Sequence, residues 1–375
     1  MSKYQELLKL LGYNFNAVRI VVEYVTGLKA VSLRELRVEN RRSDGVWPDQ
    51  TVLKYRPVHN IGCEVSIIKY QGQPCVWKER WPLETPCQVD RELEVLHMFG
   101  SHPSLVRPFG FTFDEWDDEE QEEEKKRFIV HGLLYPVEGN SNLSDINRKQ
   151  ILAPSSSELL SFLEQILSAL DHLHSHRIIH HDVCSENIII QTKPISAEKH
   201  VIVRVKLGDL GVAECVNQNG HGSEEFRFTG RFQNEAPEQK DEKSVITTKV
   251  RKKKHKSTHK FHKMNFFFHG CEQLDMFGFR LIAIYLATVG RNDVTRLFQM
   301  VRIMDSFKQV VNSIEEMKSL KASKLFLQAC DEFEKELWPV WLWDWIDKCH
   351  ASDPNDRPSA REFLAQIQTS IKNET

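Results

Sequence analysis

Hydrophobic residues in this chain follow two kinds of spacing, one typical of strands and the other typical of helices. Short apolar runs of strand length occur at 65–70, 75–78 and 128–135, and the first two are close enough to predict a hairpin. Two further runs, at 188–190 and 203–207, bracket a polar turn and predict a second hairpin. The strand patterns therefore form two groups that are well separated in the sequence.

Four other segments have apolar patterns that predict helices, and in three of them the apolar residues recur at intervals of three and four, on one face of the helix. These segments are 91–99, a stretch from near Ser157 to about 173, 274–286 and 359–371. Ser157 or a neighbouring serine is expected to cap the second helix. The run 274–286 is apolar on nearly all sides, which predicts a buried helix. Pattern alone thus predicts an α+β protein with two lobes.

Composition narrows the class of protein without naming a partner. The chain has 375 residues, 41% hydrophobic and 27% charged, which is ordinary for a globular protein. Its net charge of −3 gives no reason to expect binding to an anionic partner, so a nucleic-acid partner is not expected. None of the eight cysteines forms a C-x-x-C pair, which leaves zinc and redox motifs unsupported.

The same sequence carries no pattern of a membrane protein. The first residues lack the apolar core and cleavage site of a secretory signal, and no apolar run reaches about 18 residues. We therefore expect no membrane association and an intracellular location, cytoplasmic or nuclear or both.

The candidate chemistry lies between positions 178 and 211. His180, Asp182 and Asn187 precede the second hairpin, and Asp209 follows it directly. Buried strands hold such loops rigid, so two acidic groups and an amide can converge on a metal-bound phosphate.

These residues stand in an order that resembles the eukaryotic protein kinases. The segment HHDVCSEN at 180–187 resembles the family's H-R-D-L-x-x-x-N, and Asp209-Leu210-Gly211 resembles D-F-G. Lys78, late in the strand 75–78, matches the lysine of V-A-I-K. Glu92 matches the helix glutamate that pairs with that lysine; Glu94 is the competitor, on a different helix face.

Two landmarks farther along the chain strengthen the resemblance. Residues 236–238 are Ala-Pro-Glu, and 353–358 resemble D-P-x-x-R-P. The resemblance implies a buried pair between Glu238 and Arg357, and it implies that Asp275 bonds the backbone of the catalytic loop. The expected pair of Glu238 with Arg357 argues against the small-molecule kinases of related fold, because in the protein kinases it supports a segment that docks a peptide.

The resemblance covers about 55–372 and implies a bilobal protein-kinase-like fold. A small antiparallel-sheet lobe with one helix is expected over 51–139, and a larger, mainly helical lobe over 140–375. Residues 1–50 are expected to form an N-terminal helical extension, and a basic insertion is expected at about 240–263.

The activity implied by the resemblance is ATP- and Mg²⁺-dependent phosphoryl transfer to a protein hydroxyl, as in the Ser/Thr protein kinases. Asp182 would accept the proton of the attacking hydroxyl. Lys78, held by Glu92, would orient ATP. Asn187 and Asp209 would each bind a Mg²⁺ ion. The protein substrate itself is not named by the sequence.

Several positions depart from the family pattern. The phosphate loop, with the candidate nucleotide contacts Ile61, Gly62 and Val65, has one glycine where the family has three. His181 replaces the arginine of H-R-D, and Cys184 replaces a lysine expected two positions after the catalytic Asp. These departures support an alternative, a pseudokinase that acts as a nucleotide-binding or scaffold module.

Three segments remain as candidate partner sites. The N-terminal region, with a short amphipathic helix near 7–11 and an apolar stretch at 18–25, is expected to pack on the neighbouring lobe or to bind a partner. The acidic run 114–126 is expected to be a solvated loop. The basic stretch 251–256 is expected to be a solvated loop, with a nuclear localisation signal or a polyanion contact as alternatives.

Overall fold

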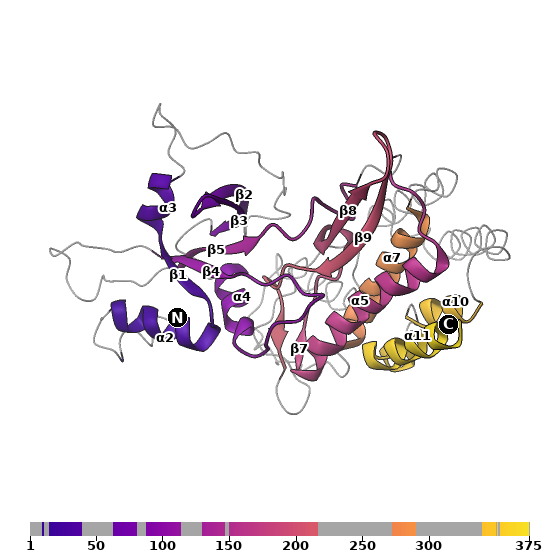
Figure 1. Ribbon diagram of the computed structural model, residues 1–375. Coiled ribbons are helices and arrows are strands. Elements are labelled where there is room, and N and C mark those ends of the chain that lie inside the picture. The colour runs from indigo at the N-terminus through magenta and orange to yellow at the C-terminus, as the bar shows by residue number, and fades with distance from the viewer. Residues whose placement is uncertain are drawn as a thin grey trace, which may run out of the picture. The chain divides into compact units, whose positions relative to one another are not determined.

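The computed structural model divides the chain into two compact units, shown as a ribbon in Figure 1. The first unit comprises 1–140 together with 208–214, and the second comprises 141–207 together with 215–375. The α+β class predicted from the sequence is confirmed, since antiparallel strand pairs and helices occur in both units. The structure describes the following residues: 10, 15–39, 63–80, 88–113, 130–146, 150–216, 272–289, 340–349, 351 and 353–374.

The first unit is built on a five-stranded sheet in the order β1-β4-β5-β3-β2. The predicted first hairpin is present: its two strands are joined by Gln71 and Gly72, whose φ angles are 52° and 76°. Two consecutive positive φ angles are the geometry of the tight hairpin turn that matches strand twist. The strands are β1 (Lys29–Ser32), β2 (Cys63–Tyr70), β3 (Gln73–Arg80), β4 (Gly110–Phe113) and β5 (Val130–Pro136).

The N-terminal region contributes directly to this sheet. Helix α2 (Phe15–Thr26) is followed by Gly27 at φ 67°, then by β1, which pairs in parallel with β4, and by α3 (Leu33–Glu39). Only one face of α2 is buried: Val18 and Val22 are inside, whereas Val25 is 48% exposed. The apolar stretch at 18–25 therefore buries every third or fourth residue, as a surface helix does.

Helix α4 (Gln88–Leu96) packs on the sheet through a stripe of apolar residues. Val89, Leu93 and Leu96 are fully buried and follow one another at intervals of four and three. The helix contacts β3 and β5, so a side chain on the same stripe faces the middle of the sheet. That placement carries Glu92 towards β3.

The second unit begins with a small strand, β6 (Ser141–Asn142), and a long helix, α5 (Ser156–Ser175). Ser155 is the cap of α5: its hydroxyl accepts from Glu158 N, and Glu158 accepts from Ser155 N in return. Buried leucines along α5 form the centre of this unit. The helix therefore starts at one of the serines expected to cap it and ends just before the candidate loop.

The predicted second hairpin follows the candidate loop. Short elements come first, β7 (Ile178–Ile179) and the 3₁₀ turn η2 (Ser185–Asn187). Strands β8 (Ile188–Pro194) and β9 (His200–Leu207) then pair antiparallel, and β6 joins the other edge of β8. A two-residue strand, β10 (Glu214–Cys215), lies at the boundary of the units.

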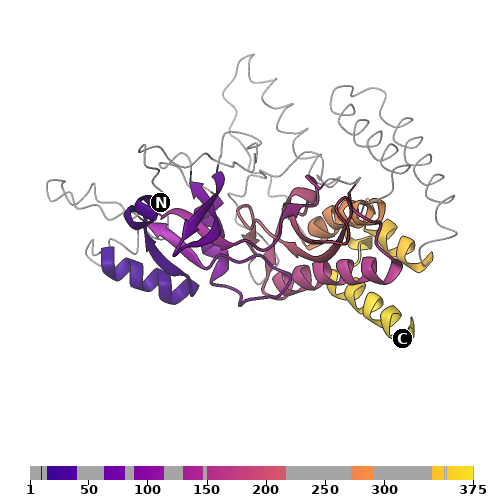
Figure 2. The same cartoon turned by 45° about the horizontal axis from the view of Figure 1, so that its top comes forward.

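The remaining helical elements in the described part of the second unit are α7 (Glu272–Thr288), α10 (Val340–Lys348), the turn η4 (Pro354–Asp356) and α11 (Ala360–Glu374). Helices α7 and α11 contact α5, while α10 and the turn η4 contact α7. Phe363 of α11 meets the ring of Phe279 edge-on at 5.7 Å and the ring of Trp345 at 5.2 Å. Figures 1 and 2 both show α11 alongside α5, where Arg361 contacts Asp171 at 3.0 Å.

Two findings concern the parts of the chain outside these elements. None of the helices in the described ranges is long and apolar enough to cross a membrane. The acidic run 114–126 and the basic stretch 251–256 lie outside the described residues, as does nearly all of the short helix expected near 7–11.

Candidate functional site

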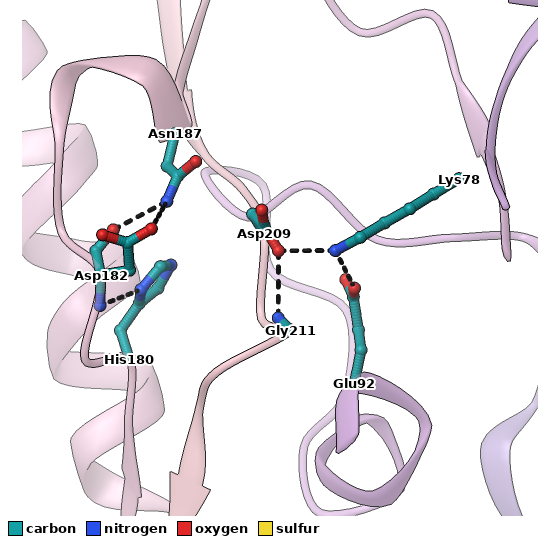
Figure 3. A network of polar contacts seen from close by, with 7 residues as sticks. All are labelled: Lys78, Glu92, His180, Asp182, Asn187, Asp209 and Gly211. Atoms are coloured by element: carbon teal, nitrogen blue, oxygen red, sulfur yellow. Dashed lines mark hydrogen bonds and ion pairs between the residues drawn. The ribbon is translucent and has the colours of Figure 1, made fainter. Parts of the chain in front are cut away.

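A buried lysine with two carboxylate partners marks the first unit. The Lys78 ammonium lies 2.9 Å from Oε2 of Glu92 and 2.6 Å from Oδ1 of Asp209, as Figure 3 shows. Lys78 is 6% exposed and Glu92 is fully buried. Burying a lysine is costly unless it is paired, and Lys78 has two carboxylate partners.

Each of the three side chains is placed by a different element. Lys78 lies in β3, where its backbone is opposite Val65 of β2 and Leu133 of β5. Glu92 projects from α4. Asp209 lies in a tight turn with φ 64°, and its Oδ1 also accepts a hydrogen bond from Gly211 N at 3.1 Å.

The second unit holds a separate network around Asp182. Both amide hydrogens of Asn187 point at this residue: Nδ2 donates to the backbone oxygen of Asp182 at 2.8 Å and to its Oδ2 at 2.9 Å (Figure 3). The backbone N of Asp182 donates to Nδ1 of His180 at 3.3 Å. Asn187 thereby holds the Asp182 carboxylate in one orientation. The side-chain carbonyl oxygen of Asn187 points away from Asp182, as Figure 3 shows.

The carboxylate of Asp275, in α7, accepts hydrogen bonds from the backbone at the start of this loop. Its Oδ2 accepts from His180 N at 2.8 Å and lies 2.9 Å from Nε2 of His174, and its Oδ1 accepts from His181 N at 2.9 Å. Burial raises the pKa of Asp275, but the hydrogen bond from His174 and the charges of all three histidines outweigh burial and lower that pKa. The carboxylate is therefore ionised, and both of its oxygens accept hydrogen bonds.

Backbone strain is concentrated in the same loop and turn. Arg177, His181 and Asp209 have φ angles of 60°, 64° and 64°, in the left-handed region that side chains disfavour. Such a residue costs on the order of 1 kcal/mol or more, and it persists only where surrounding contacts impose it. The hydrogen bonds from the His181 backbone to Asp275 and from Gly211 to Asp209 are contacts of this kind.

Gly278 is a functional position that sequence reasoning missed. A Cβ atom at this residue would lie 2.5 Å from the backbone oxygen of Val183, in the loop that carries Asp182. Glycine inside a helix costs about 1 kcal/mol relative to alanine, so its presence in α7 signals a packing reason. Here the reason is the close approach of the loop backbone to the helix.

The other sequence-predicted positions divide into two groups. Val65 is a half-buried residue of β2, and Arg357 is buried, where its Nε donates to Ala351 O at 2.9 Å and its Nη1 donates to Gln273 O at 3.1 Å. Ile61, Gly62 and the whole Ala-Pro-Glu segment lie outside the described residues, so the expected Glu238–Arg357 pair stays a prediction.

Each unit, taken by itself, offers donor groups of a kind that suits a magnesium nucleotide. Asp209 offers a carboxylate and Asn187 an amide carbonyl, and Mg²⁺ prefers oxygen ligands of these kinds together with phosphate oxygens. When ionised, Lys78, Glu92 and Asp209 carry a net charge of −1. A polyphosphate would meet that net negative charge unfavourably unless a divalent cation came with it.

Comparison with known proteins gives consistent matches. The protein kinase domain family matches residues 75–367, more than half of the chain. "Serine/threonine-protein kinase Nek5" of Homo sapiens is 26% identical over 155 residues, 40% of this chain and 19% of its own length. "Mitogen-activated protein kinase kinase kinase 1a" of Physcomitrium patens is 30% identical over 156 residues, 42% of this chain and 17% of its own length.

A third relative is similar over a shorter segment. "Inhibitor of nuclear factor kappa-B kinase subunit beta" of Rattus norvegicus is 39% identical over 90 residues, which is 24% of this chain and 11% of that protein. The chain therefore spans less than a fifth of the length of each of these three relatives.

Proposed function

Because this chain belongs to the protein kinase family, we propose that it transfers the γ-phosphoryl group of ATP to a hydroxyl of a protein substrate, in the manner of a Ser/Thr kinase. The observation that carries the proposal is the buried Lys78, held 2.9 Å from Glu92 and 2.6 Å from Asp209. A fold that needed only stability would gain as much from apolar side chains at these positions.

Each residue has a role in this reaction that its surroundings support. Lys78, kept extended by Glu92, binds phosphate oxygens of the nucleotide. Asp209 and Asn187 hold Mg²⁺, which when bound neutralises charge on the phosphates. Asp182 accepts the proton of the attacking hydroxyl, and Asn187 keeps its carboxylate in the required orientation.

Positioning is the main demand of phosphoryl transfer, and this chain meets it in a strained loop. His180 and His181 directly precede Asp182, and the backbone N–H groups of both donate hydrogen bonds to the buried carboxylate of Asp275. The proton acceptor thus sits on a segment whose geometry is imposed by a buried helix rather than by solvent-exposed contacts.

A nucleotide-binding or scaffold role without catalysis is the second candidate. It is favoured by the single glycine, Gly62, in the expected phosphate loop and by His181 in place of the family's arginine. Under this reading Lys78 and its partners would bind nucleotide or only stabilise the first unit.

The experiment that separates the two candidates combines binding with transfer. Mg²⁺–ATP is titrated while the melting temperature is followed, because a ligand of the native state must stabilise it, by about 2.7 kcal/mol at a hundredfold excess over Kd. Transfer of labelled phosphate to a general protein substrate is measured for wild type, Asp182→Asn and Asp209→Ala.

We expect stabilisation and transfer in the wild type, and loss of transfer in both variants while each remains folded at the assay temperature. Asp171→Asn, which alters an exposed ion pair with Arg361, is the matched control and should retain transfer. Stabilisation without transfer in the wild type would favour the scaffold role, and turnover by Asp182→Asn equal to wild type would overturn the proposed base.

A further inference from the structure

Tyr135 lies on the face of the sheet that carries Lys78. In the pairing of β3 with β5, Lys78 is opposite Leu133 and Val76 is opposite Tyr135. Side chains two residues apart on a strand point to the same face, so Tyr135 is the diagonal neighbour of Lys78. Because Lys78 bonds Glu92 of α4, this is the face that α4 covers.

Two buried polar atoms on this face form no hydrogen bond in the structure. They are the hydroxyl oxygen of Tyr135 and Oε1 of Glu92, the carboxylate oxygen that is not bonded to Lys78. Tyr135 is 7% exposed and Glu92 is fully buried, so solvent does not satisfy either atom. Buried polar atoms without partners are rare and call for an explanation.

The electrostatic environment makes these two atoms a donor and an acceptor. Burial raises the pKa of Tyr135 well above its usual value, and Glu92 raises it further, both as a charge and as a hydrogen-bond acceptor, while Lys78 opposes the shift. The phenol therefore keeps its proton at neutral pH and can donate it to a neighbouring acceptor. An ionised carboxylate oxygen can only accept.

We propose that Tyr135 is a positioning residue for Lys78: its hydroxyl donates to Oε1 of Glu92 and so holds Oε2 towards the ammonium group. The terminal torsion of a glutamate is soft, so a carboxylate bonded through one oxygen can turn away. A second bond from Tyr135 removes that freedom. Lys78 is then held by two carboxylates in fixed positions, as in Figure 3, rather than by Asp209 alone.

This inference deepens the proposed function and rests on it for its effect on ATP. The conservative variant Tyr135→Phe removes one oxygen and keeps the ring. We expect KM for ATP to rise about tenfold, the loss of one hydrogen bond to a charged group, with KM for the protein substrate unchanged.

Tyr70→Phe is the matched control in the same sheet. The Tyr70 hydroxyl accepts from Gln71 on the exposed side, away from Glu92, so this variant should leave KM for ATP at the wild-type value. Equal KM values for ATP in Tyr135→Phe and Tyr70→Phe would overturn the inference.

A double-mutant cycle on the unliganded protein tests the bond itself. Tyr135→Phe should lower the melting temperature by about 2–4 °C in the wild-type background. In a Glu92→Met background, where the acceptor is gone, the same change should have no effect or raise it. Equal shifts in both backgrounds would mean that Tyr135 contributes packing only.

The cycle also separates this inference from the proposed function. A wild type that neither binds nor transfers from Mg²⁺–ATP would remove the proposed function. The coupling between Tyr135 and Glu92 in the melting temperature would still decide whether the hydroxyl positions the carboxylate. Transfer by the wild type together with additive melting shifts would remove the inference and leave the function standing.

Discussion

Asp275→Asn tests whether one buried carboxylate holds the candidate loop. The side chain accepts three hydrogen bonds, from His180 N, His181 N and His174 Nε2, at 2.8–2.9 Å. The asparagine side chain has the same shape but only one acceptor oxygen, and its other terminal atom is an NH₂ group. That NH₂ group would face at least one of these three donors. A hydrogen bond to a charged group is worth about 1.5–3 kcal/mol, and a broken buried network costs about 3–5 kcal/mol.

We therefore expect the free energy of unfolding to fall by about 3 kcal/mol, or roughly 6–12 °C in melting temperature for a unit of this size. Urea unfolding followed by tryptophan fluorescence measures it. Asp171→Asn is the matched control, because its partner Arg361 is largely exposed and such a pair is worth at most about 1 kcal/mol. A loss for Asp275→Asn no larger than that of the control would refute the reasoning.

The same residue gives a pH dependence with a defined sign. Burial raises the pKa of Asp275, but His174 and the neighbouring histidines outweigh it and the folded-state pKa is lowered. A lowered folded pKa adds stability above the unfolded value, and that stability is lost as pH falls through the folded value. We expect this acid-side loss in the wild type and its absence in Asp275→Asn.

Three further outcomes follow from other described residues. Gly132→Ala should destabilise the first unit and weaken nucleotide binding, because its Cβ would lie 2.6 Å from the backbone oxygen of Lys78; melting temperature and ATP affinity measure both effects. Burial raises the pKa of Cys349 to about 12, so mass spectrometry after brief alkylation at pH 8 should find Cys215, which is half-buried, labelled before Cys349. Ser155→Ala should lower the stability of the second unit by about 1 kcal/mol in urea unfolding, through loss of the α5 cap.

Local patterns predicted the elements that depend on local chemistry. The alternating and apolar runs gave both hairpins, and the serines before 159 gave the cap of α5 within two residues. The resemblance to a family placed Glu92 opposite Lys78 and Asp275 against the loop backbone, and both contacts are present. Helix α4 begins at Gln88, three residues before the predicted start at 91. Its first turn is anchored by one buried apolar residue, Val89, and a single apolar residue is too weak a pattern to predict a helical turn.

Long-range pairing was not predictable in the same way. The four residues of β1 carry no strand-length pattern, and their partner β4 lies about 80 positions later in the chain. The roles of Tyr135 and Gly278 were missed for a related reason. A tyrosine in an apolar strand predicts a packing role. Only the register of β5 with β3 shows that Tyr135 lies beside Lys78.

The parallel pairing of β1 with β4 bears on how this protein is cut into fragments. The family match starts at residue 75, inside β3 at Cys75, and leaves out β1 and β2, two of the five strands in one sheet. A fragment that starts there would uncover the hydrogen-bonding edges of both β4 and β3, and bare strand edges recruit other chains. Expression trials should therefore start ahead of α2, because a boundary drawn from family likeness would yield an aggregation-prone half-sheet.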